Sequence, residues 1–190
     1  MRVILLNTWA LFLSFAIISL AHGLQGTLIG VRAVLEGFSF ISTGIIIAGY
    51  YFGFLGGSIA IPSLIERVGH IRVFAALASL ASIAILLHSI FLDPIVWFLI
   101  RMITGFCIVG IFIIMESWLN NKSTNATRGK LLSFYFIITF SFVGIGQLLL
   151  NVSDPAKMNL FILVSILLSF ALLPIFYRFL MRLNFLTQKE

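Results

Sequence analysis

The chain has 190 residues, of which 61% are hydrophobic and only 9% are charged. Because soluble domains carry about 25% charged residues, this composition excludes a soluble globular protein and predicts that lipid surrounds most of the surface. The formal net charge of +6 does not indicate nucleic-acid binding, since apolar residues surround the cations and no long basic stripe occurs.

Six apolar stretches are long enough to span a membrane, which takes about 20 mostly apolar residues. In chain order they are residues 3–24, 38–61, 73–91, 95–115, 131–150 and 160–179. The first stretch is long for a secretory signal, and further spans follow it. We therefore predict an all-α, polytopic membrane protein with a single six-span domain over residues 1–190.

Charge divides the connections between the spans into two sets. The first, third and fifth connections carry both signs, on Arg32, Glu36, Asp93, Asp154 and Lys157. The other connections and both ends are basic, with Arg2, Arg67, Arg72, Lys122, Arg128, Lys130, Arg178, Arg182 and Lys189. Because basic connections of membrane proteins lie in the cytoplasm, we predict a protein of the cell (inner) membrane with both termini in the cytoplasm.

Three glycines of the second span, Gly49, Gly53 and Gly57, follow one another at four-residue spacing. This spacing puts them on one face of a helix, where another backbone can approach closely. Pro62 is expected to end the span. The fifth span is also glycine-bearing, and each is the middle member of a group of three, which is a weak sign of the internal repeats found in transporters.

The connection after the second span contains Glu66, Arg67, Gly69, His70 and Arg72. Two interpretations are open. The charges form a latch that pairs differently in two conformations of a moving protein, or the connection only fixes the topology of the chain.

Arg101 stands about two turns inside the fourth span, with Gly105 one turn further on. An arginine near the middle of a membrane costs about 2.5–3.5 kcal/mol on insertion scales. The functional interpretation is a cation in a cavity that binds substrate or couples to a proton. The alternative is an arginine that extends to the outer surface or ties helices together.

Other polar residues of the spans also have two interpretations. Glu116 is either a titrating proton site or an acid at the membrane interface. His22, Gln25 and Gln147 either line a transport pathway or form contacts between helices. His88 is expected at the interface, at the outer end of the third span.

No enzyme, cofactor or metal site is predicted. The one cysteine, Cys107, lies in an apolar run and is expected to be a packing residue. The histidines are far apart, with no carboxylate at ligand spacing. No motif of a hydrolase, a metalloprotease or a nucleotide-binding loop occurs.

The segment RVGHIRVF after the glycine-bearing second span resembles a signature of the major facilitator superfamily, G-x-x-x-D-R-x-G-R-[KR]. Glu66 stands where the family has Asp, while Arg67 and Gly69 match. His70 replaces the next Arg of the signature, and Arg72 supplies a cation two residues later.

Further segments carry the same resemblance along the whole chain. Arg101 and Gly105 are similar to the R-x-x-x-G pattern of the family's fourth span, although Pro62 stands where the family has Gly in its signature. The segments ESWLNNKSTNATRGKLLSFY and GQLLLNVSDP resemble the YcaD-like branch of the superfamily.

The resemblance implies secondary transport of a small-molecule substrate by alternating access, in a protein of twelve spans whose pathway lies between two halves. This chain would be the N-terminal half, and its latch would pair with the other half. The face of Gly49, Gly53 and Gly57 would then meet a helix of that half. A truncated or split gene product, a homodimer, and a six-span protein with another role are all open. The competing hypothesis is a scaffold without transport that assembles through this glycine face.

Overall fold

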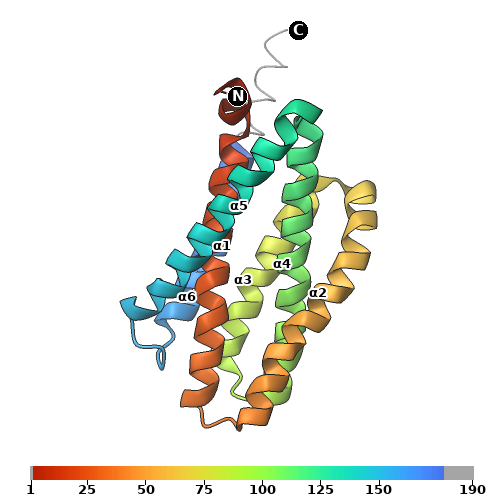
Figure 1. Cartoon of the computed structure of the whole chain (residues 1–190). Coiled ribbons are helices and arrows are strands. Elements are labelled where there is room, and N and C mark those ends of the chain that lie inside the picture. The colour runs from red at the N-terminus through yellow and green to blue at the C-terminus, as the bar shows by residue number, and fades with distance from the viewer. Residues whose placement is uncertain (1, 178–190) are drawn as a thin grey trace.

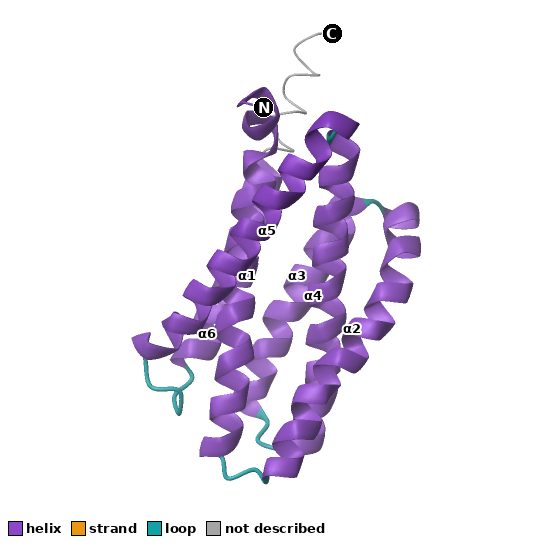
Figure 2. Cartoon of the chain, in the orientation of Figure 1, coloured by secondary structure: helices purple, strands orange, loops and turns teal. Residues whose placement is uncertain are grey.

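The computed structural model describes the backbone of residues 2–177 and the side chains of residues 8–177. This part of the chain forms a bundle of helices joined by short turns, without strands (Figures 1 and 2). The helices are α1 (Arg2–Leu35), α2 (Phe40–Val68), α3 (His70–Ile90), α4 (Pro94–Lys122), α5 (Asn125–Leu148) with the 3-10 turn η1 (Leu149–Val152), and α6 (Asn159–Phe170). Six segments are long and apolar enough to cross a membrane, the last of them Asn159–Tyr177. The predicted fold class is therefore confirmed.

Three helices extend beyond their predicted ends. The first continues past Leu24 to Leu35, the second continues through Pro62 to Val68, and the fourth continues past Met115 to Lys122. The prediction that Pro62 ends the second span is therefore wrong, because membrane helices tolerate proline where neighbouring groups satisfy the freed carbonyl. Gly69 ends α2 instead, with a φ of 91° that favours glycine. The predicted end of the last span, Phe179, lies outside the described residues.

The turn into α4 is set by its own sequence. A carboxylate oxygen of Asp93 accepts hydrogen bonds from the backbone N–H groups of Ile95 and Val96, at 2.9 and 3.0 Å. Pro94, which has no N–H to satisfy, occupies the first turn of the helix. This cap fixes where α4 begins and so fixes the depth of the residues that follow it.

The helices pair in a pattern that repeats within the chain. The first helix packs mainly against α5 and α6, and α4 packs mainly against α2 and α3. If α1–α3 are exchanged with α4–α6 in order, the pairs α1–α5 and α1–α6 become α4–α2 and α4–α3. The other large contact, between α3 and α6, is then exchanged with itself. This pairing agrees with the internal repeat that the glycine-bearing spans indicated.

The contact between α2 and α4 is a contact of backbone on backbone. A Cβ atom at Gly53 would collide with the carbonyl oxygen of Met102, and one at Gly105 would collide with the carbonyl oxygen of Tyr50. Each helix thus contributes a glycine at the point where the other presents a carbonyl. Membrane helices associate through this kind of close packing, because lipid supplies no hydrophobic force between them.

The glycine face of α2 is therefore covered from within the chain. A Cβ at Gly49 would meet Phe98, and one at Gly57 would meet Val109, both on α4. The prediction that Gly49, Gly53 and Gly57 face a helix of a second half is wrong, and the same face is not open to a scaffold partner. The spacing of the glycines showed a close helix contact but not which helix makes it.

The pair α1 and α5 is built in the same way. A Cβ at Gly23 would collide with the carbonyl oxygen of Val143, and one at Gly146 with that of Leu20. The α2–α4 and α1–α5 pairs, which the internal repeat relates, thus pack in the same way: a glycine of each helix faces a backbone carbonyl of the other.

The ends of the bundle differ in charge, as predicted. The α2–α3 and α4–α5 connections lie at the end where α1 begins, and the other connections lie at the opposite end (Figure 1). The first end carries the described cations Arg67, Arg72, Lys122, Arg128 and Lys130. The side chains of Arg2, Arg178, Arg182 and Lys189 lie outside the described residues.

Substitution of Gly53 tests the α2–α4 contact. We expect Gly53→Ala to lower the free energy of unfolding by about 1–3 kcal/mol, because the new methyl group displaces the backbone of α4. The measurement is reversible unfolding of the purified protein in mixed micelles. Gly56→Ala is the matched control, because no atom of another helix lies within 4 Å of its Cβ position. Equal stability of the two variants would contradict the contact.

Candidate functional site

A cluster of polar side chains connects α1, α2 and α4 inside the bundle. Arg101 on α4 is only 7% exposed, and its guanidinium carbon lies 4.7 Å from the centre of the Tyr50 ring on α2. The Tyr50 ring stacks in turn on His22 of α1, with ring centres 5.8 Å apart. The three helices are thus linked through a cation and two rings.

The glycine contact between α2 and α4 places the two main residues of this cluster. The backbone of Tyr50 rests directly on Gly105, which is one helical turn after Arg101. The tyrosine ring and the guanidinium are therefore brought together by the packing of their own backbones. By helix rise, Arg101 lies about 10 Å from the start of α4, well inside the apolar part of the bundle. Gly105, predicted as a pathway residue, is buried in this contact.

Gln25 lies on the same face of α1 as His22, since the two residues are three positions apart. Its side chain is 1% exposed, and its amide nitrogen has no hydrogen-bond partner among the described residues. The position of Gln25, about 15 Å from the end of α1, matches that of Tyr50 from the start of α2. Gln25 therefore belongs to the level of the bundle that holds the cluster.

His88 lies near the end of α3, closer than Arg101 to the end of the bundle where α4 begins, and it is fully buried. Its Nδ1 lies 3.1 Å from the carbonyl oxygen of Ala84, and its ring meets the edge of Trp97 at 5.3 Å. Phe38 packs on the other side of Trp97. The expectation that His88 lies at the membrane interface stays a prediction. Two aromatic rings cover this end of α3, and His88 lies two residues before it.

The electrostatics of the cluster are one-sided. Arg101 carries the charge, and across residues 8–177 no carboxylate lies within ion-pair distance of it. The Nε atom of Arg101, the amide nitrogen of Gln25 and the Nε2 atom of the nearby His88 are buried and have no described partner. An unpaired charge and unsatisfied donors in a low-dielectric interior are costly, so the arrangement favours an additional acceptor at this place.

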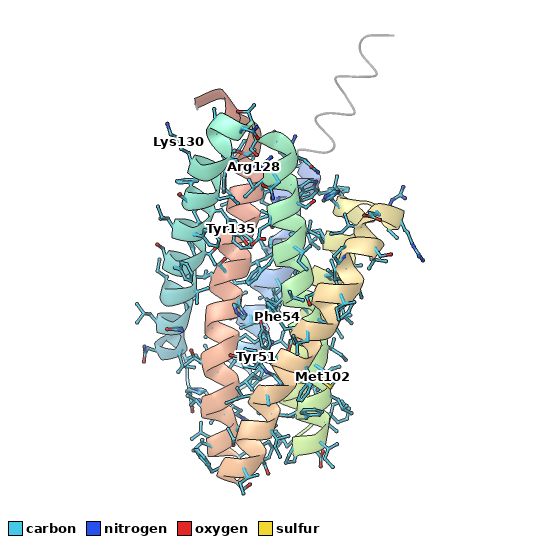
Figure 3. The ribbon with its side chains drawn as sticks, turned by 45° about the vertical axis from the view of Figure 1, so that its right-hand side comes forward. Tyr51, Phe54, Met102, Arg128, Lys130 and Tyr135 are labelled. Carbon is cyan, nitrogen blue, oxygen red and sulfur yellow. The ribbon has the colours of Figure 1, made fainter. Side chains whose placement is uncertain are left out.

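Aromatic side chains of α2 and α4 adjoin the cluster. His22 meets the edge of the Phe112 ring at 5.9 Å. Tyr51 and Phe54, whose rings contact Tyr50, lie on α2, whereas Tyr135 lies nearer the end that carries Arg128 and Lys130 (Figure 3). The side chain of Tyr51 is 62% exposed, so the cluster adjoins the surface of the bundle.

Two predicted site residues are not buried in the Arg101 cluster, for different reasons. Glu116 is about 22 Å further along α4, where it accepts a hydrogen bond from the Tyr135 hydroxyl at 3.3 Å. Gln147 follows Gly146, which packs against the backbones of Leu20 and Leu24 on α1, so Gln147 lies at the level of His22 with an exposed side chain. The structure therefore brings His22, Gln25 and Gln147 to the level of Arg101, although Gln147 is not buried with them, and places Glu116 elsewhere.

The predicted latch is held by a histidine in this structure. His70 hydrogen-bonds the Ser117 hydroxyl through Nε2 at 2.9 Å, and its ring stacks on Trp118 with centres 5.5 Å apart. Glu66, Arg67 and Arg72 are exposed, and they form no ion pair with another described residue. The connection between α2 and α3 is thus fixed to the end of α4 by aromatic stacking and one hydrogen bond.

Comparison with known proteins agrees with this architecture. Residues 32–179 match the family described as "Uncharacterised MFS-type transporter YbfB". The chain belongs to this family of MFS-type transporters. It is 26% identical over 161 residues to "Uncharacterized MFS-type transporter YcaD" of Escherichia fergusonii, covering 85% of this chain and 42% of that protein. It is 28% identical over 137 residues to the MFS-type transporter YE1530 of Yersinia enterocolitica, covering 70% and 35%.

This MFS-type chain therefore spans about two fifths of the length of the relatives it matches. The resemblance found in the sequence motifs is confirmed at the level of the family. The match also covers the region that contains Arg101, Tyr50 and His88.

Sequence reasoning did not predict that Tyr50 and His88 lie near Arg101. Tyr50 follows Gly49 directly, and a tyrosine beside a predicted close helix contact is a signal that its ring reaches the neighbouring helix. For His88 the position near the end of an apolar run gave no such signal, since its burial depends on Trp97 from another helix.

His70→Ala tests how the α2–α3 connection is held. The variant loses a hydrogen bond and an aromatic contact, each worth about 0.5–1.5 kcal/mol, so we expect roughly tenfold faster local opening. The measurement is amide hydrogen exchange over residues 66–72. Arg72→Ala is the control, and similar exchange in both variants would contradict the clamp.

Proposed function

We propose that the chain is the N-terminal half of a secondary active transporter that moves a small solute by alternating access, and that Arg101 is part of its binding site. The observation that supports this most directly is the buried, unpaired guanidinium over the Tyr50 ring. A charge kept inside the membrane against a cost of about 2.5–3.5 kcal/mol is typical of substrate and ion pathways.

The position of the guanidinium argues against one part of the alternative interpretation of Arg101, an arginine that extends to the outer surface, whereas a link between helices is compatible with it. An arginine that extends to the outer surface would direct its charged group toward the end of α4 and be exposed there. The Arg101 side chain instead lies against Tyr50 and is buried. His22 and Gln25 complete the proposed site, and Glu116 and Gln147 are not included in it.

We further propose that α2 and α5 face a second six-helix unit. Of their most apolar windows only 33% and 17% are buried, against 67% for α1, 61% for α4 and 50% for α3; the last span, at 33%, is as exposed as α2. The two helices occupy equivalent places in the internal repeat, which suits a partner that contacts both. The exposed Glu66, Arg67 and Arg72 would pair with charges of that unit, which is either the missing half or a second copy of this chain.

The basic end of the bundle is proposed to face the cytoplasm, which would place the start of α1 inside the cell. We expect a membrane-impermeant maleimide to label Lys157→Cys in intact spheroplasts, and Lys130→Cys only after permeabilisation. Both are made in a Cys107→Ser background, since Cys107 is the one cysteine of the chain. The opposite labelling pattern would reverse the proposed orientation.

Transport is tested in a chimaera in which this chain replaces the matched segment of the Escherichia fergusonii relative. Proteoliposomes that contain the chimaera are incubated with a bacterial metabolite extract under an imposed ion gradient. The solutes that accumulate inside them are identified by mass spectrometry. We expect gradient-dependent accumulation of at least one solute, and we expect Arg101→Ala to abolish it at unchanged protein content.

Arg128→Ala serves as the matched control, because Arg128 lies in the first turn of α5 at the end of the bundle. Its accumulation should equal that of the unchanged chimaera. Absence of accumulation in the unchanged chimaera would contradict transport, and normal accumulation with Arg101→Ala would remove Arg101 from the pathway.

A further inference from the structure

We propose that the solute bound at the Arg101 cluster is a small organic monoanion, a carboxylate attached to an apolar body. The inference rests on the proposed function, because it assigns the chemical class of the substrate to the same site. It follows from four properties of the cluster: its charge, its free hydrogen-bond donors, its walls and the number of its cations.

The charge of Arg101 is not neutralised by the described part of the chain. Every described acidic side chain lies away from it: Glu36 pairs with Arg32, Asp93 caps α4, Asp154 accepts from the N–H of Ala156, Glu66 is exposed, and Glu116 contacts Tyr135. The Tyr50 ring offers only a cation–π contact, which is a partial compensation. A ligand that enters this site meets an uncompensated positive charge.

The unused hydrogen-bonding groups of Arg101 and Gln25 are donors. A guanidinium has no acceptor, and the amide nitrogen of glutamine only donates. Both nitrogens are buried without a described partner. A carboxylate presents acceptor oxygens only, and it suits the planar fork of an arginine better than a hydroxyl, an amide or an amine does.

The remaining surroundings limit the rest of the ligand. Tyr50, His22 and Phe112 form a continuous set of ring contacts, and Phe54 packs near Tyr50. Such walls favour an apolar or aromatic body. Arg101 is the one arginine or lysine among the residues of this cluster, so a dianion such as phosphate would leave a net negative charge buried.

The test compares three probes of similar size but different charge. Thermal unfolding of the purified chain in detergent is followed with benzoate, benzamide and benzylamine at equal ionic strength. We expect benzoate to raise the midpoint with increasing concentration, and neither benzamide nor benzylamine to do so. A shift by benzamide or benzylamine as large as that by benzoate, or no shift by benzoate, overturns the proposal, as does an equal shift by inorganic phosphate.

Variants assign the effect to the cluster. Arg101→Gln should weaken the apparent affinity for benzoate at least about tenfold, and Arg128→Gln should leave it unchanged. Gln25→Leu removes the second donor at similar side-chain volume. It should weaken benzoate binding without making the protein bind benzamide. If Arg101→Gln does not fold, Gln25→Leu decides, and an unchanged benzoate affinity in the variant that is measured overturns the proposal.

Failure of this inference is distinguishable from failure of the proposed function. If proteoliposomes with the chimaera accumulate only neutral or cationic solutes, the proposed transport is supported and the proposed anionic substrate is contradicted. If benzoate binding depends on Arg101 but no solute accumulates, the proposed anion site is supported and the proposed transport is contradicted.

Discussion

The contact between the backbones of α2 and α4 is the constraint on which the rest of this structure depends. Gly53 and Gly105 each receive a carbonyl of the opposite helix, so no side chain separates the two backbones. The same contact carries Tyr50 to within reach of Arg101, one turn away. Helix packing and the candidate site are therefore one feature, and a change that separates the helices also separates the cation from its ring.

The internal repeat explains why the polar cluster lies where it does. One glycine-mediated pair joins α1 to α5, and the other joins α4 to α2. The two pairs are close-packed internally, while the surfaces they present to each other are joined through side chains. His22 comes from one pair, and Arg101 and Tyr50 come from the other. A site that draws on both pairs responds to any movement of one relative to the other.

The sequence supported the fold more securely than the site. Long apolar runs separated by charged turns determine six spans, because each turn residue acts locally, as Asp93 does at α4. Helix ends such as that beyond Pro62 were missed, since they depend on neighbours that satisfy the backbone. Arg101 was detectable as a charge in an apolar run. Its ring partner Tyr50 and the burial of His88 arise only when separate helices pack, and four-residue glycine spacing could not say that α4 covers Gly53.

The unpaired state of Arg101 also bears on how binding and movement are connected. A buried cation without a counter-charge raises the free energy of the conformation that contains it, and the Tyr50 ring offsets only part of this cost. A ligand that supplies the missing charge therefore stabilises that conformation specifically, and a ligand shifts an equilibrium only by such a difference between states. On the proposed function, the missing counter-charge of Arg101 would favour an anionic ligand. The same missing counter-charge would make the occupied and the empty protein prefer different arrangements of the α1–α5 and α4–α2 pairs. The chemistry of Arg101 and the mechanics of the bundle would then have a common physical origin.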